Sequence, residues 1–411
     1  MATVKLKISE LKDTLKFVIN NNKELQKQGK VPIACEVIGE SGLGKTSGIL
    51  QIGEELGLPV VKLNLAMVEE LGDVVGFPIR QFQLCKEEHK TEGNGAIQEC
   101  LWIDENAVNT YEKEGYKFTG KKRMSYCPPE WIADKTEGGI LLLDDCFRAD
   151  VRFLQAIMDL VNTQKYISWE LPKGWTIILS NNPADGEYIV NSTDPAQKSR
   201  FISFELEFGK DDWAAWAEKN GIDGRCINFL LLHPELVDGT GVGKDKVKNK
   251  AVNPRSATMF FNTISGIKDF QAELPLIQLV GEGSVGLEFS TLFTTFINNK
   301  LDRLPTPEYM LTGKWENVEN EIRGVVTDTH SGQYRADIGA VLMTRIINYS
   351  LSYAEKETVK DNMIERLKDL VTEDLFLTDL KYNIVREIFN GNKQKFKKLT
   401  LDADVSRMIL A

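Results

Sequence analysis

Residues 39–46 read Gly39-Glu40-Ser41-Gly42-Leu43-Gly44-Lys45-Thr46, and this stretch decides the fold of the chain. It fits the pattern G-x-x-x-x-G-K-[ST]. An apolar, β-branched segment, 31–38, precedes it, and a segment with helical spacing, 45–57, follows it. A strand, a glycine-rich turn and a helix start together direct backbone N–H groups at a polyphosphate. The plainer alternative, a glycine-rich turn beside a surface lysine, leaves this strand and helix context unexplained. The sequence therefore predicts a phosphate-binding loop over residues 39–46.

Two side chains of this loop have specific expected roles. We expect Lys45 to reach the β- and γ-phosphates of ATP, and the Thr46 hydroxyl to ligate Mg²⁺. The glycines let the backbone approach the phosphates closely, because they lack a Cβ atom. The predicted cofactors are therefore ATP and Mg²⁺.

Composition bounds the remaining classes. The chain has 411 residues, 42% of them hydrophobic and 27% charged, which is ordinary for a globular protein and enough for two or three domains. Its net charge of −10 argues against a general nucleic-acid coat, although residues 121–123 form a small basic cluster. No apolar run approaches the roughly 20 residues of a membrane span, and residues 1–7 lack the apolar core of a signal peptide.

The cysteines predict a reducing compartment. Six of them are scattered along the chain without a C-x-x-C pair, and such spacing in a long chain indicates reduced thiols and a cytoplasmic protein. A zinc site is an alternative reading of one segment, but the spacing of its four residues fits no common finger. These residues are Cys85, His89, Cys100 and Cys127.

Strand-like and helical segments alternate in the first half of the chain. This alternation predicts a parallel sheet covered on both faces. The pattern breaks over residues 83–127, which look like an insertion, and helical patterning dominates after about residue 210. The expected strands are 31–38, 59–65, 139–144, 175–180 and 201–207, and the expected helices include 8–28, 45–57, 149–163 and 211–219.

A second motif supplies the acidic groups that a phosphate-loop enzyme needs. Residues 139–143 form an apolar, buried-type strand that ends in Asp144 and Asp145. One acid at such a strand tip holds Mg²⁺ and a second polarises the attacking water. We therefore expect Asp144 on the metal and Asp145 as the base. A strand that simply exits into solvent could also end in acids, but the phosphate loop favours the functional interpretation.

The order of the motifs that follow resembles the AAA+ ATPases, and within them the MoxR-like and dynein-related branch. The resemblance covers roughly residues 31–310. The residues that carry it are Asp73-Val74-Val75-Gly76, Pro128-Pro129-Glu130-Trp131, Arg148-Ala149, the hairpin segment 165–171, Asn181-Asn182-Pro183, Arg200-Phe201, the segment 211–217 and Asn253-Pro254-Arg255. It implies a five-stranded parallel α/β sheet with a phosphate loop, then a helical lid and a helical C-terminal region. The implied boundaries are 1–208, 209–300 and 301–411.

The resemblance also implies roles for three further residues. Asn182 would be the sensor that orients the attacking water, with Asn181 as its alternative. Arg200 would be an arginine finger that reaches a neighbouring subunit's nucleotide, and Arg255 a nucleotide-binding sensor in the lid. Such groups stabilise charge on the transferring phosphoryl. Plainer readings exist for each: a turn residue before proline, a surface ion pair and a helix cap.

Two positions depart from the family pattern. The usual Asp-Glu pair is Asp144-Asp145 here, so the expected base is one methylene shorter, and Phe147 stands where the MoxR pattern tends to have asparagine. The shorter acid is also consistent with an alternative, a subunit that binds nucleotide and hydrolyses it slowly or not at all.

Three functions therefore compete. The leading hypothesis is an ATP-driven remodelling motor that acts on a protein partner as a homo-oligomeric ring, most simply a hexamer, since a finger in trans works only in an oligomer. Proteins of this branch often work with von Willebrand A-type partners. The alternative is a nucleotide-gated binding or scaffold module with little turnover. A DNA-directed motor comes third, because the acidic balance disfavours nucleic acid as partner.

Overall fold

A computed structural model describes residues 4–89, 96–184, 195–238, 252–328 and 331–410. The chain divides into two compact units. The first contains Met1–Glu40 and Gly44–Leu206, and the second contains Ser41–Leu43 and Glu207–Ala411. Each unit has its own hydrophobic core.

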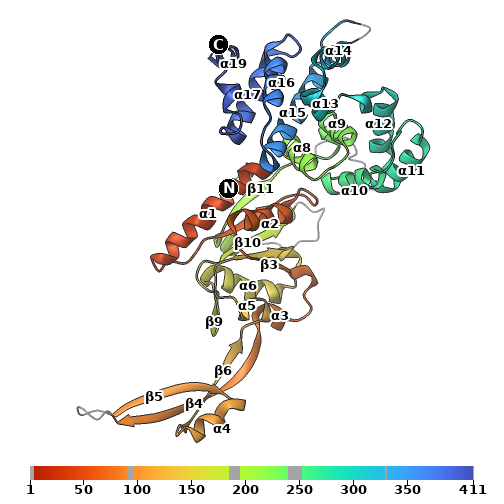
Figure 1. Cartoon of the computed structure of the whole chain (residues 1–411). Helices are drawn as coiled ribbons and strands as arrows, with labels where there is room; N and C mark the ends of the chain where they lie inside the picture. Colours follow the sequence, from red (N-terminus) through yellow and green to blue (C-terminus); the bar gives the residue numbers. More distant parts are fainter. Residues whose placement is uncertain (1–3, 90–95, 185–194, 239–251, 329–330, 411) are drawn as a thin grey trace. The chain divides into compact units, whose positions relative to one another are not determined.

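A six-stranded sheet forms the centre of the first unit (Figure 1). All of its strand pairs are parallel. Their order across the sheet is β1 (Val4–Leu6), β11 (Phe201–Leu206), β2 (Ala34–Ile38), β10 (Thr176–Asn181), β7 (Ile140–Asp144) and β3 (Val60–Asn64). This arrangement confirms the predicted fold class, a parallel α/β sheet followed by helices. The prediction of five strands missed β1, a three-residue edge strand that is largely exposed and so carries no apolar signal.

Helices cover the two faces of this sheet. Leu141 and Leu143 of β7 belong to the core that contains α6 (Val151–Thr163). Leu142 points to the opposite face because side chains alternate along a strand. There α2 (Lys45–Leu56) contacts β7 and packs beside α1 (Ile8–Lys27). Leucines of β7 have no exposed surface, and burying one stabilises the fold by about 1.5–3 kcal/mol.

The predicted insertion is a three-stranded antiparallel sheet, which Figure 1 draws as a long ribbon. Its order is β5 (Ala96–Asp104), β4 (Phe77–His89) and β6 (Lys117–Cys127), with α4 (Val108–Lys113) between β5 and β6. The sheet begins at Phe77, so the expected start at residue 83 was six residues late. Most of β6 is exposed, so its sequence lacks the alternation that reveals a half-buried strand.

The cysteine prediction is wrong for two of the six residues. Cys85 of β4 and Cys100 of β5 are cross-strand partners and form a disulfide. The other four cysteines, Cys35, Cys127, Cys146 and Cys226, are free. A zinc site shared by Cys85 and Cys100 is therefore excluded in this state. In the part of the chain that the structure describes, His, Cys, Asp and Glu form no group of three or more that could hold a metal ion.

The second unit is helical and is held together by one continuous hydrophobic core. A cluster of edge-to-face phenylalanines lies within it, including Phe229, Phe260 and Phe293.

No helix among the described residues is long and apolar enough to cross a membrane. The subdivision at residue 300 stays a prediction. The helices are α8 (Lys210–Lys219), α9 (Gly224–Leu232), α10 (Pro254–Ile264), α11 (Leu274–Ser284), α12 (Leu287–Asn298), α13 (Pro307–Thr312), α14 (Trp315–Val326), α15 (Ala336–Lys356), α16 (Asp361–Thr372), α17 (Thr378–Asn392), α18 (Lys397–Thr400) and α19 (Ala403–Leu410).

Candidate nucleotide-binding site

The predicted phosphate loop connects β2 to α2. Gly42 and Gly44 have φ angles of +87° and +90°, a left-handed conformation that glycine adopts without a Cβ penalty. Gly44 is the N-cap of α2, so the helix begins at Lys45. The free N–H groups of a helix start favour an anion at this point. The local backbone is therefore that of the strand, turn and helix start expected from the sequence.

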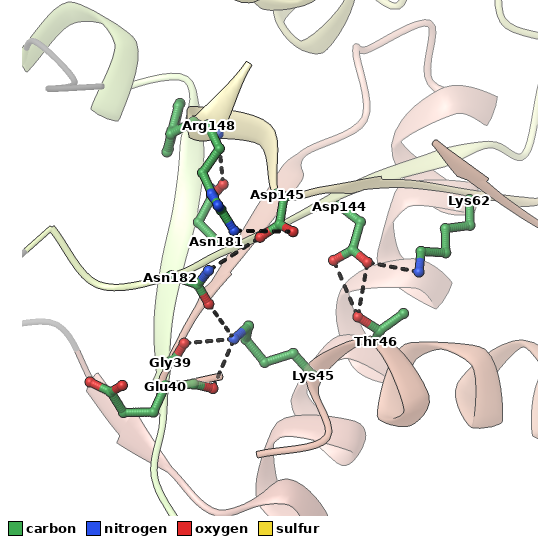
Figure 2. A network of polar contacts seen from close by, with 11 residues as sticks. Gly39, Glu40, Lys45, Thr46, Lys62, Asp144, Asp145, Arg148, Asn181 and Asn182 are labelled. Carbon is green, nitrogen blue, oxygen red and sulfur yellow. Dashed lines mark hydrogen bonds and ion pairs between the residues drawn. The ribbon is translucent and has the colours of Figure 1, made fainter. Parts of the chain in front are cut away.

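Lys45 is almost fully buried, and its ammonium group is surrounded by oxygen atoms (Figure 2). Its Nζ atom donates to the carbonyl oxygens of Gly39 at 2.6 Å and Glu40 at 3.0 Å. It also donates to Oδ1 of Asn182 at 3.1 Å. A buried ammonium needs such partners, because an unpaired buried charge is very costly. These bonds hold Lys45 at the base of the loop.

Thr46 and Asp144 meet beside this lysine. The Thr46 hydroxyl lies 3.2 Å and 3.1 Å from the two carboxylate oxygens of Asp144. Lys62 of β3 reaches the same carboxylate, with Nζ 2.9 Å from Oδ2. Burial opposes ionisation of Asp144, but hydrogen bonds from Lys62, Ser180 and Thr46 outweigh it and lower the pKa of this carboxyl group. An ionised carboxylate beside a hydroxyl is an oxygen donor set that suits Mg²⁺.

Asp145 begins a second, connected set of contacts. Its Oδ1 atom accepts a hydrogen bond from Nδ2 of Asn182 at 3.2 Å, and Arg148 Nη1 lies 4.0 Å from its other oxygen. Asn182 thus bridges Lys45 and Asp145 (Figure 2). Asp145 has a φ of +50°, in the left-handed region that aspartate enters more readily than most residues.

Asn181 makes a different set of bonds from its neighbour. Its Nδ2 atom donates to Oε1 of Glu36 at 2.9 Å, and its Oδ1 atom accepts from the backbone N–H of Phe147 at 3.0 Å. Ser203 donates to the other oxygen of Glu36 at 2.6 Å. Burial is the largest influence on Glu36 and raises the pKa of its carboxyl group above the usual value. Phe147, where the sequence departs from the family pattern, therefore still makes a backbone hydrogen bond: its N–H donates to the Asn181 side chain.

The two predicted arginines lie in different units of the chain, Arg200 in the first and Arg255 in the second. Arg200 is exposed, between α7 (Pro195–Lys198) and β11, and its Nη1 atom donates to the carbonyl of Met158 at 3.2 Å. Arg255 is the second residue of α10 in the helical unit and is also exposed. The capping of α10 is done by Asn253, whose side chain accepts from Ser256 N–H at 3.0 Å, so capping is not a role of the Arg255 side chain.

The first unit therefore brings together Lys45, Thr46, Asp144, Asp145 and Asn182. Lys62 and Glu36 belong to no motif of the sequence and were not predicted, although both carry a weak signal. Each is a charged residue inside a short apolar strand, at positions where a parallel strand usually carries valine, isoleucine or leucine.

Comparisons with known proteins add little to this geometry. No family model matches the chain, and no curated protein matches it. Among solved structures, the RuvB Holliday junction branch migration motor of Thermotoga maritima is similar over 79% of this chain and 86% of its own, at 14% identity and a TM-score of 0.32. A putative ATPase from Cytophaga hutchinsonii is similar over 92% of this chain and 89% of its own, at 11% identity and a TM-score of 0.30. Similarities at this level do not identify what the chain binds or does.

Proposed function

We propose that the chain is an ATP-hydrolysing AAA+ ATPase of the MoxR-like type that remodels a protein partner. The observation that carries the proposal is the bridge that Asn182 makes between Lys45 and Asp145, next to the Thr46–Asp144 pair. These five side chains come from three separate segments of sequence. Lys45, Thr46, Asp144 and Asp145 were expected at such a site from their motifs, and Asn182 from the family resemblance, with Asn181 as its alternative.

In this proposal the residues divide the work on ATP and Mg²⁺. The backbone of Gly39–Thr46 and the Lys45 ammonium bind the phosphates, and Thr46 with Asp144 holds the metal ion. Mg²⁺, when bound, would neutralise charge on the phosphate oxygens. Asp145 would accept a proton from the attacking water, and Asn182 would orient that water. Arg255 would bind nucleotide from the helical unit, and Arg200 would act on the nucleotide of a neighbouring copy in a ring.

The first test is Asp145→Asn, which removes the base and changes one atom of the side chain. We expect it to bind ATP like the parent and to lose turnover. Its matched control is Asp150→Asn, at the exposed N-cap of α6, which should keep parental turnover. Turnover by Asp145→Asn at the parental rate would contradict the assignment of the base.

A nucleotide-gated scaffold with little turnover is the alternative function. The observation that favours it is Asp145 itself, which is shorter than the glutamate of the family pattern and stands in a left-handed backbone. ATPase assays across a range of protein concentrations separate the two functions, since a shared-site ring becomes more active per chain as it assembles. Turnover that stays near zero at every concentration, with ATP bound, favours the scaffold.

The partner of this proposed motor is a protein, with von Willebrand A-type domains as one candidate class. The sheet of β4, β5 and β6 supports a contact role because most side chains of β6 are exposed. A cytoplasmic location is also part of this proposal, although the Cys85–Cys100 disulfide is a pairing that oxidising compartments favour. A deletion from 83 to 122 would remove most of this sheet and test its role by partner capture. Basal ATPase should survive, and loss of folding would instead assign the sheet a structural role.

A further inference from the structure

A lysine outside every recognised motif occupies the expected metal side of the site. Lys62 lies on β3, the edge strand that pairs with β7 in parallel register. Its register partner is Leu142, two residues before Asp144. The side chains of Lys62 and Asp144 therefore lie on the same face of the sheet and are diagonal neighbours. The ammonium reaches along the sheet to Oδ2 of Asp144 at 2.9 Å (Figure 2).

The Asp144 carboxylate that Lys62 contacts also interacts with Thr46. Both oxygens of Asp144 lie within hydrogen-bond distance of the Thr46 hydroxyl. The Asp144 side chain is only 12% exposed, whereas that of Lys62 is 40% exposed. A carboxylate this enclosed needs a positive partner, because leaving a buried charge unpaired is strongly unfavourable. Lys62 supplies that partner from the solvent side.

A divalent cation and this ammonium would compete for the same carboxylate. Mg²⁺ requires oxygen ligands at about 2.0–2.1 Å or an ordered water shell between itself and the carboxylate. An ammonium at hydrogen-bond distance from Asp144 occupies part of that shell and repels the ion. The lysine stem is long and flexible, and its exposed head can leave for solvent while the enclosed carboxylate stays in place.

We propose that Lys62 is a built-in counter-ion of the metal site, which neutralises Asp144 until Mg²⁺ and nucleotide bind and which must then release it. This inference rests on the proposed nucleotide site and adds a positioning residue to it. Lys62 thereby sets the Mg²⁺ concentration at which the site fills.

The test compares Lys62→Met with Lys62→Arg. Methionine keeps most of the stem and removes the charge, and arginine keeps the charge. A matched control is Lys5→Met, which removes a surface ion pair with Glu205 at the far edge of the same sheet and changes the net charge equally. Binding of a fluorescent ADP analogue is measured as a function of free Mg²⁺, so the readout does not depend on turnover.

We expect Lys62→Met to need about tenfold less Mg²⁺ for half-maximal nucleotide binding, the size of one charge-assisted hydrogen bond. The Mg²⁺ concentration that Lys62→Arg and Lys5→Met need should stay within about threefold of the parent's, since neither variant removes the positive charge beside Asp144. An unchanged Mg²⁺ dependence in Lys62→Met would overturn the inference. So would a higher Mg²⁺ requirement, which would show that Lys62 helps to hold the metal site open.

A second measurement separates this inference from the proposed function. Nucleotide-free parent and Lys62→Met are titrated with Mn²⁺, and free Mn²⁺ is followed by electron paramagnetic resonance. Tighter Mn²⁺ binding by Lys62→Met than by the parent supports the counter-ion role, whether or not the parent binds nucleotide. A parent that binds no nucleotide would contradict the ATPase proposal and leave the counter-ion role standing. Equal Mn²⁺ binding by the two proteins would overturn the counter-ion role.

Discussion

Asn181 and Asn182 are adjacent in sequence, but their side chains serve opposite sides of the end of β10. Asn182 connects Lys45 to Asp145, and Asn181 connects Glu36 to the backbone of Phe147. The alternation of side chains along an extended chain produces this split. One asparagine therefore belongs to the proposed nucleotide site, and the other holds the strands and the turn behind it.

Alanine at each of these positions should separate the two roles. Asn182→Ala should fold and bind nucleotide but lose most of its turnover, because the proposed water-orienting group is gone. Asn181→Ala should lose about 1–3 kcal/mol of unfolding free energy, since it leaves the Phe147 N–H and a Glu36 oxygen short of a buried partner. Chemical denaturation and ATPase assays on both variants check this. A large turnover loss in Asn181→Ala with parental stability would reverse the assignment.

Nucleotide binding should require Lys45. Lys45→Ala removes a positive charge beside the expected β- and γ-phosphates, and a lost charge-assisted bond costs about 1.5–3 kcal/mol. Nucleotide affinity should therefore fall at least about tenfold. Lys27→Ala, on an exposed residue of α1, is the matched control and should bind like the parent. Binding of a fluorescent ATP analogue measures both, and parental affinity in Lys45→Ala would remove the phosphate-loop assignment.

The stability of the first unit should depend on pH through Glu36. The raised pKa of Glu36 means that the folded state favours its neutral form. Its contribution to folding is complete below the usual glutamate pKa of about 4.3 and is lost as the pH rises through the raised value. Glu36→Gln cannot ionise and keeps an oxygen to accept from Asn181. We therefore expect its unfolding free energy to increase relative to the parent between pH 4 and 7.

Denaturant titrations at several pH values measure this difference. The matched control is Glu24→Gln at the surface of α1, whose stability relative to the parent should show no comparable trend. A difference between Glu36→Gln and the parent that stays constant with pH would show that Glu36 keeps the same charge in the folded and unfolded chain.

The sequence predicted the parts of the fold that are apolar and regular. Apart from β1, the strands of the central sheet were placed to within three residues. The signal is strongest at Ile140–Asp144 and Thr176–Asn181, which are buried throughout and read as largely apolar runs. The exposed strands β1 and β6 gave no such pattern. The disulfide of Cys85 and Cys100 depends on the register of β4 and β5, which spacing along the chain does not reveal.

The candidate site shows the same division. The loop, Asp144 and Asp145 belong to motifs with defined spacing, so their meeting could be expected from the sequence. Asn182 was expected from the family resemblance, which left Asn181 as an alternative. Lys62 and Glu36 act through contacts across the sheet, Lys62 with Asp144 and Glu36 with Asn181 and Ser203. A lone charged residue in a strand is more often an exposed edge position, and only the order of the strands shows which partner it faces.

The last prediction concerns Arg200 and the proposed ring. In the described part of the chain this exposed guanidinium donates to the Met158 carbonyl, and an exposed arginine is accessible to a neighbouring copy. Arginine fingers contribute roughly 10³–10⁵ in rate. Arg200→Ala should therefore bind ATP normally and hydrolyse it poorly. Mixed with Lys45→Ala protein, it should regain activity, because a mixed ring contains interfaces with an intact Lys45 and an intact Arg200. Parental turnover by Arg200→Ala, or sedimentation of the ATP-bound parent as a monomer at every concentration, would exclude the shared site.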